Sequence, residues 1–316
     1  MDELYTYELL DWVNEEKILS SWYLSTNPNA TELLDKNYTK IDWFLFSLNS
    51  KALHVLQKYN EFLNWRCLCA NPNAISILER GYKIPYADTL SSNYNAINLL
   101  ETHPECIDWH SLCSNKNAIH LLEKNLDKID WEILCDNPSA IHLLEKNEEK
   151  ICWMSLSSNP NAVHLLNRNQ EKIDWTNLSS NPNAIQLLES NLDKIDWEIL
   201  CDNPSAIHIL EKNEEKICWM SLSSNPNAVH LLERNLDKVD WSLLSSNQNA
   251  IHILQRNIDK IDWFWLAKNP SIFRKKINYR FLKEKMDVIR EEMMMKCMHP
   301  RRLERWLEMA GDIDDF

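Results

Sequence analysis

Residues 135–153 read CDNPSAIHLLEKNEEKICW, and residues 201–219 read CDNPSAIHILEKNEEKICW. The two stretches differ only where Leu143 is replaced by Ile209. An enzyme needs one set of reactive groups, and a second copy of the same segment adds little to catalysis. The duplication therefore favours a protein that builds a long, regular surface.

The duplicated stretch contains a shorter period of 22 residues. An asparagine recurs twelve times at this spacing, from Asn27 to Asn269, and a tryptophan stands six residues before ten of these asparagines. The 42 residues from Asn125 match the 42 from Asn191 with one change, which indicates duplication of a three-repeat block. A fixed period of this length is typical of solenoids, in which each repeat buries its apolar face against its neighbours.

Each repeat predicts two short helices. The first begins at the residue before Trp, for example Asp130, whose carboxylate can accept backbone N–H groups. The second begins at the recurrent asparagine, with Asn137 as its N-cap and Pro138 in its first turn, where a missing N–H costs nothing. A second asparagine column lies ten residues later. It includes Asn147 and is Gly81 in one repeat, so it predicts a left-handed backbone that ends the second helix.

The apolar columns predict the core and the fold class. They are Ile, Trp and Leu around the first helix, and Ala, Ile and two Leu in the second, the Ala allowing neighbouring helices to approach closely. The expected fold is all-α: a superhelical α-solenoid of about twelve 22-residue two-helix repeats over residues 21–272. Helices about 8–10 Å apart would give a rod on the order of 100 Å long. Residues 1–20 are expected to form a helical cap, and residues 273–316, where the period stops, a helical cap or docking module.

Composition limits where the chain acts and what it binds. Lys and Arg number 34 against 47 Asp and Glu, a net charge of −13, which disfavours nonspecific attraction to nucleic acid or to anionic membranes. No apolar run approaches the roughly 18 residues of a membrane span, and the acidic start MDELYTYELLDW is no signal peptide. Nine cysteines in no compact framework fit a reducing compartment. The chain is expected to be intracellular, without membrane association, and not secreted.

The repeat also carries a resemblance. Its consensus, NPNAIxLLEKNxDKIDW, and the ending MHPRRLERWLEMAGDIDDF resemble the uncharacterised short-tandem-repeat proteins of large double-stranded DNA viruses. The repeats at Asn49, Asn93, Asn115 and Asn247 lack the proline, and Ala87 replaces one tryptophan. The resemblance implies a viral context, in the host cytoplasm or in the virion, and no particular reaction.

Motifs for catalysis and for metal or cofactor binding are not found in the sequence. Only two glycines are present, so no glycine loop can hold a phosphate, and neither H-E-x-x-H nor G-x-S-x-G occurs. Seven histidines form one column, five residues after the asparagine, at His54, His120, His142, His164, His208, His230 and His252. Neighbours in that column should lie about 9–10 Å apart, whereas zinc ligands lie about 2 Å from one ion. A solvated polar column is expected, with no enzyme activity, no metal and no cofactor.

Two surfaces are candidates for partner binding. One is the face of the second helix two, five and nine residues after the asparagine, represented by Asn161, His164, Arg168, Asn227, His230 and Arg234. The other is C-terminal, with Arg301, Arg302 and Arg305 opposite an acidic surface and Leu303, Trp306 and Leu307 as an apolar anchor. The expected function is a noncatalytic scaffold for protein–protein interaction. The alternatives are a modular nucleic-acid-binding repeat protein, which the lysine columns would serve, and a virion structural component.

Overall fold

The structure is a computed structural model that describes residues 4–80, 86–297, 299, 301–302 and 305. Its contacts divide the chain into two compact units, one of residues 9–272 and one of residues 1–8 with 273–316. The larger unit is an all-α repeat solenoid, as the 22-residue period predicts.

The first helices of successive repeats stack in series along the larger unit. They are η2 (Trp22–Thr26, a 3-10 helix), α3 (Trp43–Leu48), α5 (Trp65–Ala70), α7 (Ala87–Ser92), α9 (Trp109–Leu112), α11 (Trp131–Asp136), α13 (Trp153–Ser158), α15 (Trp175–Ser180), α17 (Trp197–Asp202), α19 (Trp219–Ser224), α21 (Trp241–Ser246) and α23 (Trp263–Leu266). The carboxylate of Asp130 accepts the backbone N–H groups of Glu132 and Ile133 at 3.1 and 3.3 Å, so the predicted N-cap of the first helix is confirmed.

The second helices begin three or four residues later than the sequence predicts. They are α2 (Thr31–Lys36), α4 (Leu53–Lys58), α6 (Ile75–Leu78), α8 (Ile97–Thr102), α10 (Ile119–Leu122), α12 (Ile141–Glu145), α14 (Val163–Arg168), α16 (Ile185–Glu189), α18 (Ile207–Lys212), α20 (Val229–Arg234) and α22 (Ile251–Arg256), and η11 (Pro270–Ile272) follows α23. Asn137 is the C-cap of α11, and Ala140 is the N-cap of α12. The N-cap role predicted for the recurrent asparagine is therefore wrong.

The second asparagine column ends the second helix by a different route from the predicted one. Asn147 has φ −136° and ψ 48°, which is not left-handed. Its Nδ2 donates to the carbonyl oxygen of Leu143 at 2.8 Å, so the side chain binds a carbonyl that the helix end leaves unpaired. Gly81, which takes the place of the asparagine in one repeat and also suggested a left-handed backbone, lies outside the described residues. Short 3-10 turns then lead to the next repeat in most cases: η3 (Tyr38–Lys40), η4 (Asn60–Phe62), η5 (Pro104–Cys106), η6 (Leu126–Lys128), η7 (Glu148–Lys150), η8 (Gln170–Lys172), η9 (Glu214–Lys216) and η10 (Ile258–Lys260).

The core lies between the two layers of helices. Leu134 from the first helix and Ala140 and Leu144 from the second are fully buried, as are their counterparts in other repeats. The tryptophans were expected in this core, but Trp153 is only half-buried and Trp65 is 39% exposed. A lysine at the end of the same repeat covers the ring in several repeats, with Nζ between 4.4 and 4.8 Å from the ring centroid: Lys128 on Trp109, Lys172 on Trp153, Lys194 on Trp175, Lys238 on Trp219 and Lys260 on Trp241. The lysine column therefore makes cation–π contacts.

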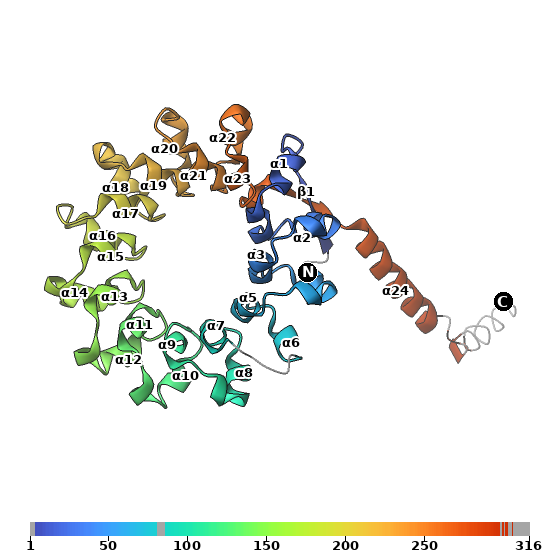
Figure 1. The fold of residues 1–316 in the computed structure, drawn as a ribbon, viewed down its shortest axis with the longest axis horizontal. Helices are drawn as coiled ribbons and strands as arrows, with labels where there is room; N and C mark the ends of the chain where they lie inside the picture. The colour runs from blue at the N-terminus through green and yellow to red at the C-terminus, as the bar shows by residue number, and fades with distance from the viewer. Residues whose placement is uncertain (1–3, 81–85, 298, 300, 303–304, 306–316) are drawn as a thin grey trace, which may run out of the picture. The chain divides into compact units, whose positions relative to one another are not determined.

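The first and last repeats are joined, so the larger unit is a closed ring and the expected open rod is wrong. Asn49 Nδ2 donates to the carbonyl oxygens of Ser25 and Asn27 in the preceding repeat, at 3.1 and 3.0 Å. Asn27 Nδ2 donates in the same way to Ala267 and Asn269, at 2.9 and 3.0 Å. The first repeat thus binds the last repeat through the same contacts by which Asn49 binds the repeat before it. Figure 1 shows residues 9–272 as this ring, with the first helices α5, α11 and α17 on its inner side and the second helices α6, α12 and α18 outside.

The smaller unit contains the only sheet found among the described residues. Strand β1 (Tyr5–Leu9) pairs with β2 (Phe273–Ile277), and Glu8 forms ion pairs with Arg274 and Lys276 at 2.7 and 2.9 Å. The long helix α24 (Tyr279–Cys297) follows. The helical cap expected over residues 1–20 is therefore wrong for residues 5–9, which find a strand partner near the other end of the chain. Helix α1 (Glu15–Leu19) is the helical part of that segment.

Candidate interaction surface

The asparagines predicted on the second-helix face hold the array together. Asn161 Nδ2 donates to the carbonyl oxygen of Pro138 in the preceding repeat at 2.8 Å, and Asn227 Nδ2 does the same to Pro204 at 2.8 Å. Their side-chain donors are thus engaged between repeats. The main role of Asn161 and Asn227 is therefore to hold neighbouring repeats together.

The histidine column pairs with glutamates of the preceding repeat. His164 Nε2 lies 2.8 Å from Glu145 Oε1, and His230 Nε2 lies 2.7 Å from Glu211 Oε1. The same arrangement recurs for His120 with Glu101, His142 with Glu123, His208 with Glu189 and, at the longer distance of 3.8 Å, His252 with Glu233. Within the described ranges no three His, Cys, Asp or Glu side chains are grouped to hold a metal ion.

Arg168 and Arg234 are exposed and form no ion pair with other described residues, so they are the free members of the predicted face.

The predicted C-terminal docking residues are described only in part. Arg301, Arg302 and Arg305 are exposed, and Arg302 Nη1 donates to the carbonyl oxygen of Lys296 at 3.3 Å. Leu303, Trp306 and Leu307 lie outside the described residues. The docking role of this segment stays a prediction.

A different surface exposes large apolar side chains in a regular register. We call it the first-helix face: the side chains one, two and five residues after the Trp position of each repeat, on the helices that line the inner side of the ring (Figure 1). Trp22, Phe44, Met154 and Met220 occupy the first of these positions and are 53%, 54%, 51% and 55% exposed. Leu48, at the third, is 41% exposed. Exposed apolar side chains that share one face of a protein make that face a candidate interaction site.

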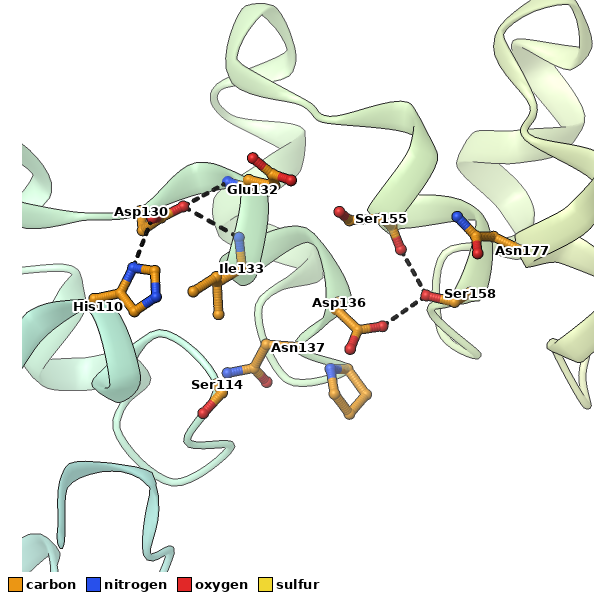
Figure 2. A pocket seen from close by; sticks show the side chains of 11 residues that line it. His110, Ser114, Asp130, Glu132, Ile133, Asp136, Asn137, Ser155, Ser158 and Asn177 are labelled. Atoms are coloured by element: carbon orange, nitrogen blue, oxygen red, sulfur yellow. Dashed lines mark hydrogen bonds and ion pairs between the residues drawn. The ribbon is translucent and has the colours of Figure 1, made fainter. Parts of the chain in front are cut away.

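An open groove lies on the same face and is lined by acidic and hydroxyl groups. Its volume is about 680 Å³, and Figure 2 shows residues of α9, α11, α13 and α15 around it. His110 Nδ1 lies 2.9 Å from Asp130 Oδ2, and Ser158 Oγ donates to Asp136 Oδ1 at 2.7 Å. Glu132 lines the groove as well, so three carboxylates and one histidine are among its lining residues. The groove therefore suits a basic group of a partner.

The duplicated block repeats the acidic and apolar parts of this face. Glu198 and Asp202 stand where Glu132 and Asp136 stand, three repeats earlier. Ser224 Oγ donates to Asp202 Oδ1 at 3.1 Å, as Ser158 does to Asp136. The first-helix face therefore carries the same carboxylate pair and methionine at two places.

Aromatic side chains gather where the ring closes. The rings of Trp22 and Phe264 meet edge-on with centroids 4.6 Å apart, and Tyr23 stacks on Trp265 at 5.2 Å. Such pairs contribute beyond the area that they bury. The cluster therefore both stabilises the closing junction and adds exposed aromatic surface to the first-helix face.

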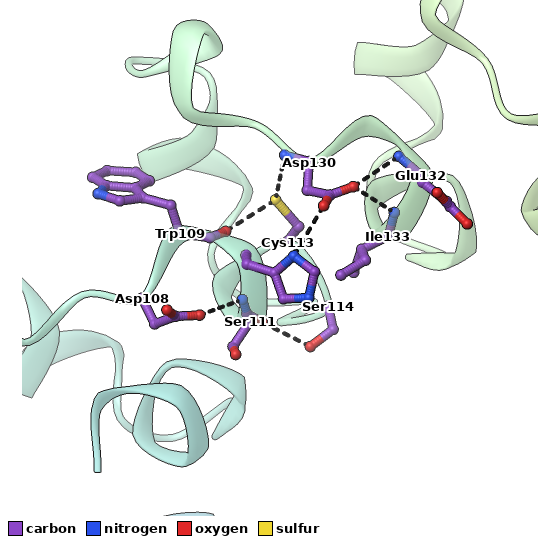
Figure 3. A network of polar contacts seen from close by, with 9 residues as sticks. Asp108, Trp109, Ser111, Cys113, Ser114, Asp130, Glu132 and Ile133 are labelled. Carbon is purple, nitrogen blue, oxygen red and sulfur yellow. Dashed lines mark hydrogen bonds and ion pairs between the residues drawn. The ribbon is translucent and has the colours of Figure 1, made fainter. Parts of the chain in front are cut away.

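A polar network behind the groove positions its residues (Figure 3). Cys113 Sγ accepts the backbone N–H of Asp130 at 3.3 Å and donates to the carbonyl oxygen of Trp109 at 3.1 Å. The backbone N–H of Ser111 donates to Asp108, which holds the pKa of that carboxyl below its usual range. Burial raises the pKa of the Cys113 thiol. This cysteine is protonated at neutral pH and acts as a hydrogen-bonding group of the junction.

The first-helix face could not be predicted from the repeat consensus because the residue directly after the Trp position changes from one repeat to the next. Arg66, Asp88, His110, Glu132 and Met154 occupy the same position in successive repeats. That variation was itself a usable signal, since positions that pack or cap stay constant from repeat to repeat while a recognition surface is free to vary.

Comparison with family models, with curated proteins and with solved structures gives no match. Among the helices of the described residues, none combines the length and the apolarity needed to cross a membrane.

Proposed function

We propose that this protein is a noncatalytic scaffold that binds a protein partner through the first-helix face. The observation that carries the proposal is the register of Phe44, Met154 and Met220, which are more than half exposed at equivalent positions of three repeats. Isolated apolar side chains are common on protein surfaces, whereas exposed apolar side chains that share one face with a polar groove favour recognition.

The chemistry of the face favours a partner with basic and apolar side chains. Asp136 and Glu132 supply negative charge on α11, the first helix of the repeat before that of Met154, and methionine adapts its shape to varied contacts. The charge disfavours a nucleic acid, whose phosphates would meet carboxylates, and several lysines of the column lie on tryptophan rings. The resemblance of the repeat to viral repeat proteins supports a partner in an infected cell. Eight free cysteines among the described residues support a reducing compartment.

Two sets of substitutions separate the candidate surfaces. The first combines Phe44→Ser, Met154→Thr and Met220→Ser on the first-helix face, using residue types that Thr176 and Ser242 place there in other repeats. The second, matched set is Arg168→Glu with Arg234→Glu on the second-helix face. Each tagged protein is expressed in the infected host cell, and the captured partners are identified.

We expect the first set to lose the principal partner and the second set to retain it, with unchanged circular dichroism for both. Loss only in the arginine set would transfer the function to the second-helix face. Retention by both sets, or a shift of a labelled oligonucleotide at moderate salt, would contradict the proposal.

A further inference from the structure

A backbone-to-side-chain hydrogen bond joins successive repeats at an equivalent place. The residue four after Trp accepts the backbone N–H of the residue that precedes the next Trp. Ser157 Oγ accepts from Asp174 at 3.0 Å, and Ser179 Oγ accepts from Asp196 at 3.0 Å. This contact brings two side-chain positions of neighbouring repeats together.

Cysteines occupy both positions at two junctions. Cys135 Sγ accepts the backbone N–H of Cys152 at 3.2 Å, and Cys201 Sγ accepts that of Cys218 at 3.3 Å. Cys152 and Cys218 are the only cysteines that stand directly before a Trp in the sequence, and each follows a repeat with a cysteine at the accepting position. At both junctions, therefore, the accepting cysteine and the cysteine before Trp occur together.

The backbone geometry suits a disulfide. An N–H hydrogen bond is nearly linear, so the Cα atom of Cys152 lies about 4 Å from the sulfur of Cys135. A disulfide needs Cα atoms about 4.4–6.8 Å apart, a span that this contact allows without moving the backbone far. Rotation of the Cys152 side chain about its Cα–Cβ bond can then direct its sulfur toward Cys135.

The Cys152 side chain is free to rotate because it caps nothing. Asp174, at the same position, holds the backbone N–H of Asn177 at 2.8 Å. Cys152 accepts no such bond from helix α13, and the Ser155 hydroxyl donates to its sulfur at the long distance of 3.6 Å. Cys152 is half-buried, so a small oxidant can reach it, whereas Cys135 is fully buried.

We propose that Cys135–Cys152 and Cys201–Cys218 are two redox-sensitive pairs that peroxide converts into disulfides between neighbouring repeats. Hydrogen peroxide oxidises the Cys152 thiol to a sulfenic acid and releases one water. The Cys135 thiol then displaces the sulfenic oxygen, which leaves as a second water, and the S–S bond forms. Two electrons pass from the two thiols to the peroxide, and Cys201 with Cys218 reacts in the same way. Each disulfide links a first helix covalently to the next, so oxidation locks two junctions of the ring.

Other cysteines provide internal controls. Cys69 and Cys113 take the same position as Cys135, but Tyr86 and Asp130 stand where Cys152 would be. Both are buried, and neither faces a second cysteine across its junction. Peroxide should leave these two thiols reduced.

The test counts thiols in the full chain. The protein is treated with hydrogen peroxide, blocked with N-ethylmaleimide, denatured and analysed by thiol titration and by mass spectrometry of tryptic peptides. Wild type should fall from its nine thiols to five as four are consumed. The peptides of Cys135 and Cys201 have equal masses because Leu143 and Ile209 are isomers. A Cys201→Ser, Cys218→Asp variant, which retains only the first pair, is therefore mapped separately.

The matched variants use residues that other repeats carry. A Cys152→Asp, Cys218→Asp protein keeps seven thiols and should lose none, and a Cys135→Ser, Cys201→Ser protein should form no intramolecular disulfide. Circular dichroism confirms that each variant is folded. The proposal is overturned if wild type retains nine thiols, if its disulfides involve Cys69 or Cys113 or join two molecules, or if the aspartate variant loses as many thiols as wild type. The serine variant decides the matter if the aspartate variant does not fold.

Discussion

Replacing Asn159 tests how the repeats are held together. Asn159 is fully buried, and its Nδ2 donates to the carbonyl oxygens of Cys135 and Asn137 in the preceding repeat at 2.8 and 3.1 Å. Its Oδ1 accepts the backbone N–H of Asn161 at 3.0 Å. The side chain thus makes three hydrogen bonds, two of which cross the junction.

The loss of stability in Asn159→Ala depends on which groups lose a hydrogen-bond partner. The carbonyl oxygen of Asn137 also accepts the N–H of Ala140, so it stays paired in Asn159→Ala. The carbonyl oxygen of Cys135 and the N–H of Asn161 lose the bonds described here. Three lost bonds, one of which leaves the carbonyl oxygen of the buried Cys135 without a partner, should lower the free energy of unfolding by about 3–5 kcal/mol. Loss of a simple helix cap would cost about 1 kcal/mol.

Asn159→Asp separates the two roles sharply. Aspartate caps helices as well as asparagine, so a residue that only capped would tolerate it. In the junction, aspartate would place a carboxylate oxygen against two carbonyl oxygens and supply no donor. We therefore expect Asn159→Asp to be at least as destabilising as Asn159→Ala.

Thermal and urea unfolding followed by circular dichroism measures these effects. A loss of about 3–5 kcal/mol should lower Tm by roughly 10 °C in a unit of this size. Asn161→Ala, which removes one exposed bond to Pro138, is the control and should cost about 0.5 kcal/mol. The junction role is refuted if Asn159→Asp unfolds like wild type, or if Asn159→Ala costs no more than the control.

Three other perturbations probe separate parts of the molecule. Lys172→Ala uncovers the Trp153 ring and should lower the free energy of unfolding in urea by about 0.5–1 kcal/mol, while Lys172→Arg should retain most of it. Removal of residues 273–316 takes away strand β2, whose Arg274 and Lys276 pair with Glu8, and should leave a helical ring with a Tm a few degrees lower. An unchanged Tm with loss of one captured partner would instead indicate a docking segment. Burial raises the pKa of the Cys69, Cys135 and Cys201 thiols from 9.0 to about 11, so these thiols ionise first in the unfolded chain. Their contribution to stability is complete below pH 9 and is lost as pH rises toward 11, which urea titrations across that range should show, less steeply in Cys135→Ser.

Features that depend on contacts within one repeat could be predicted from the sequence. Asp130 as a cap, Ala140 at the close approach and Leu144 in the core follow from spacing alone, because their partners lie within a few residues or in an identical neighbour. The role of Asn137 could not be predicted, because an asparagine before proline has the same appearance whether it caps a helix or donates across a junction. Its Nδ2 bond to the carbonyl oxygen of Cys113, at 2.8 Å, spans 24 residues.

Closure and the candidate site depend on longer-range relations. Whether Asn27 meets Asn269 depends on a small rotation at every junction, and local sequence patterns do not encode its sum. The pairing of β1 with β2 likewise joins opposite ends of the chain. The second-helix histidines seemed free to bind because the glutamate that faces each of them lies 19 residues earlier. The first-helix face could not be predicted because the residue after the Trp position differs from one repeat to the next.

Closure has a consequence for how this gene can change. An open array can gain or lose copies by unequal recombination and remain an array, so its length drifts. Here the contact of Asn27 with Asn269 is the last of twelve junctions that close the ring, so each junction turns by about 30°. Excision of one duplicated three-repeat block would leave nine steps, each needing about 40°, a bend that the asparagine bonds across every junction would have to accommodate at once. The number of repeats is thus constrained by the need to close the ring, whereas substitutions on the first-helix face leave the junctions between repeats unchanged.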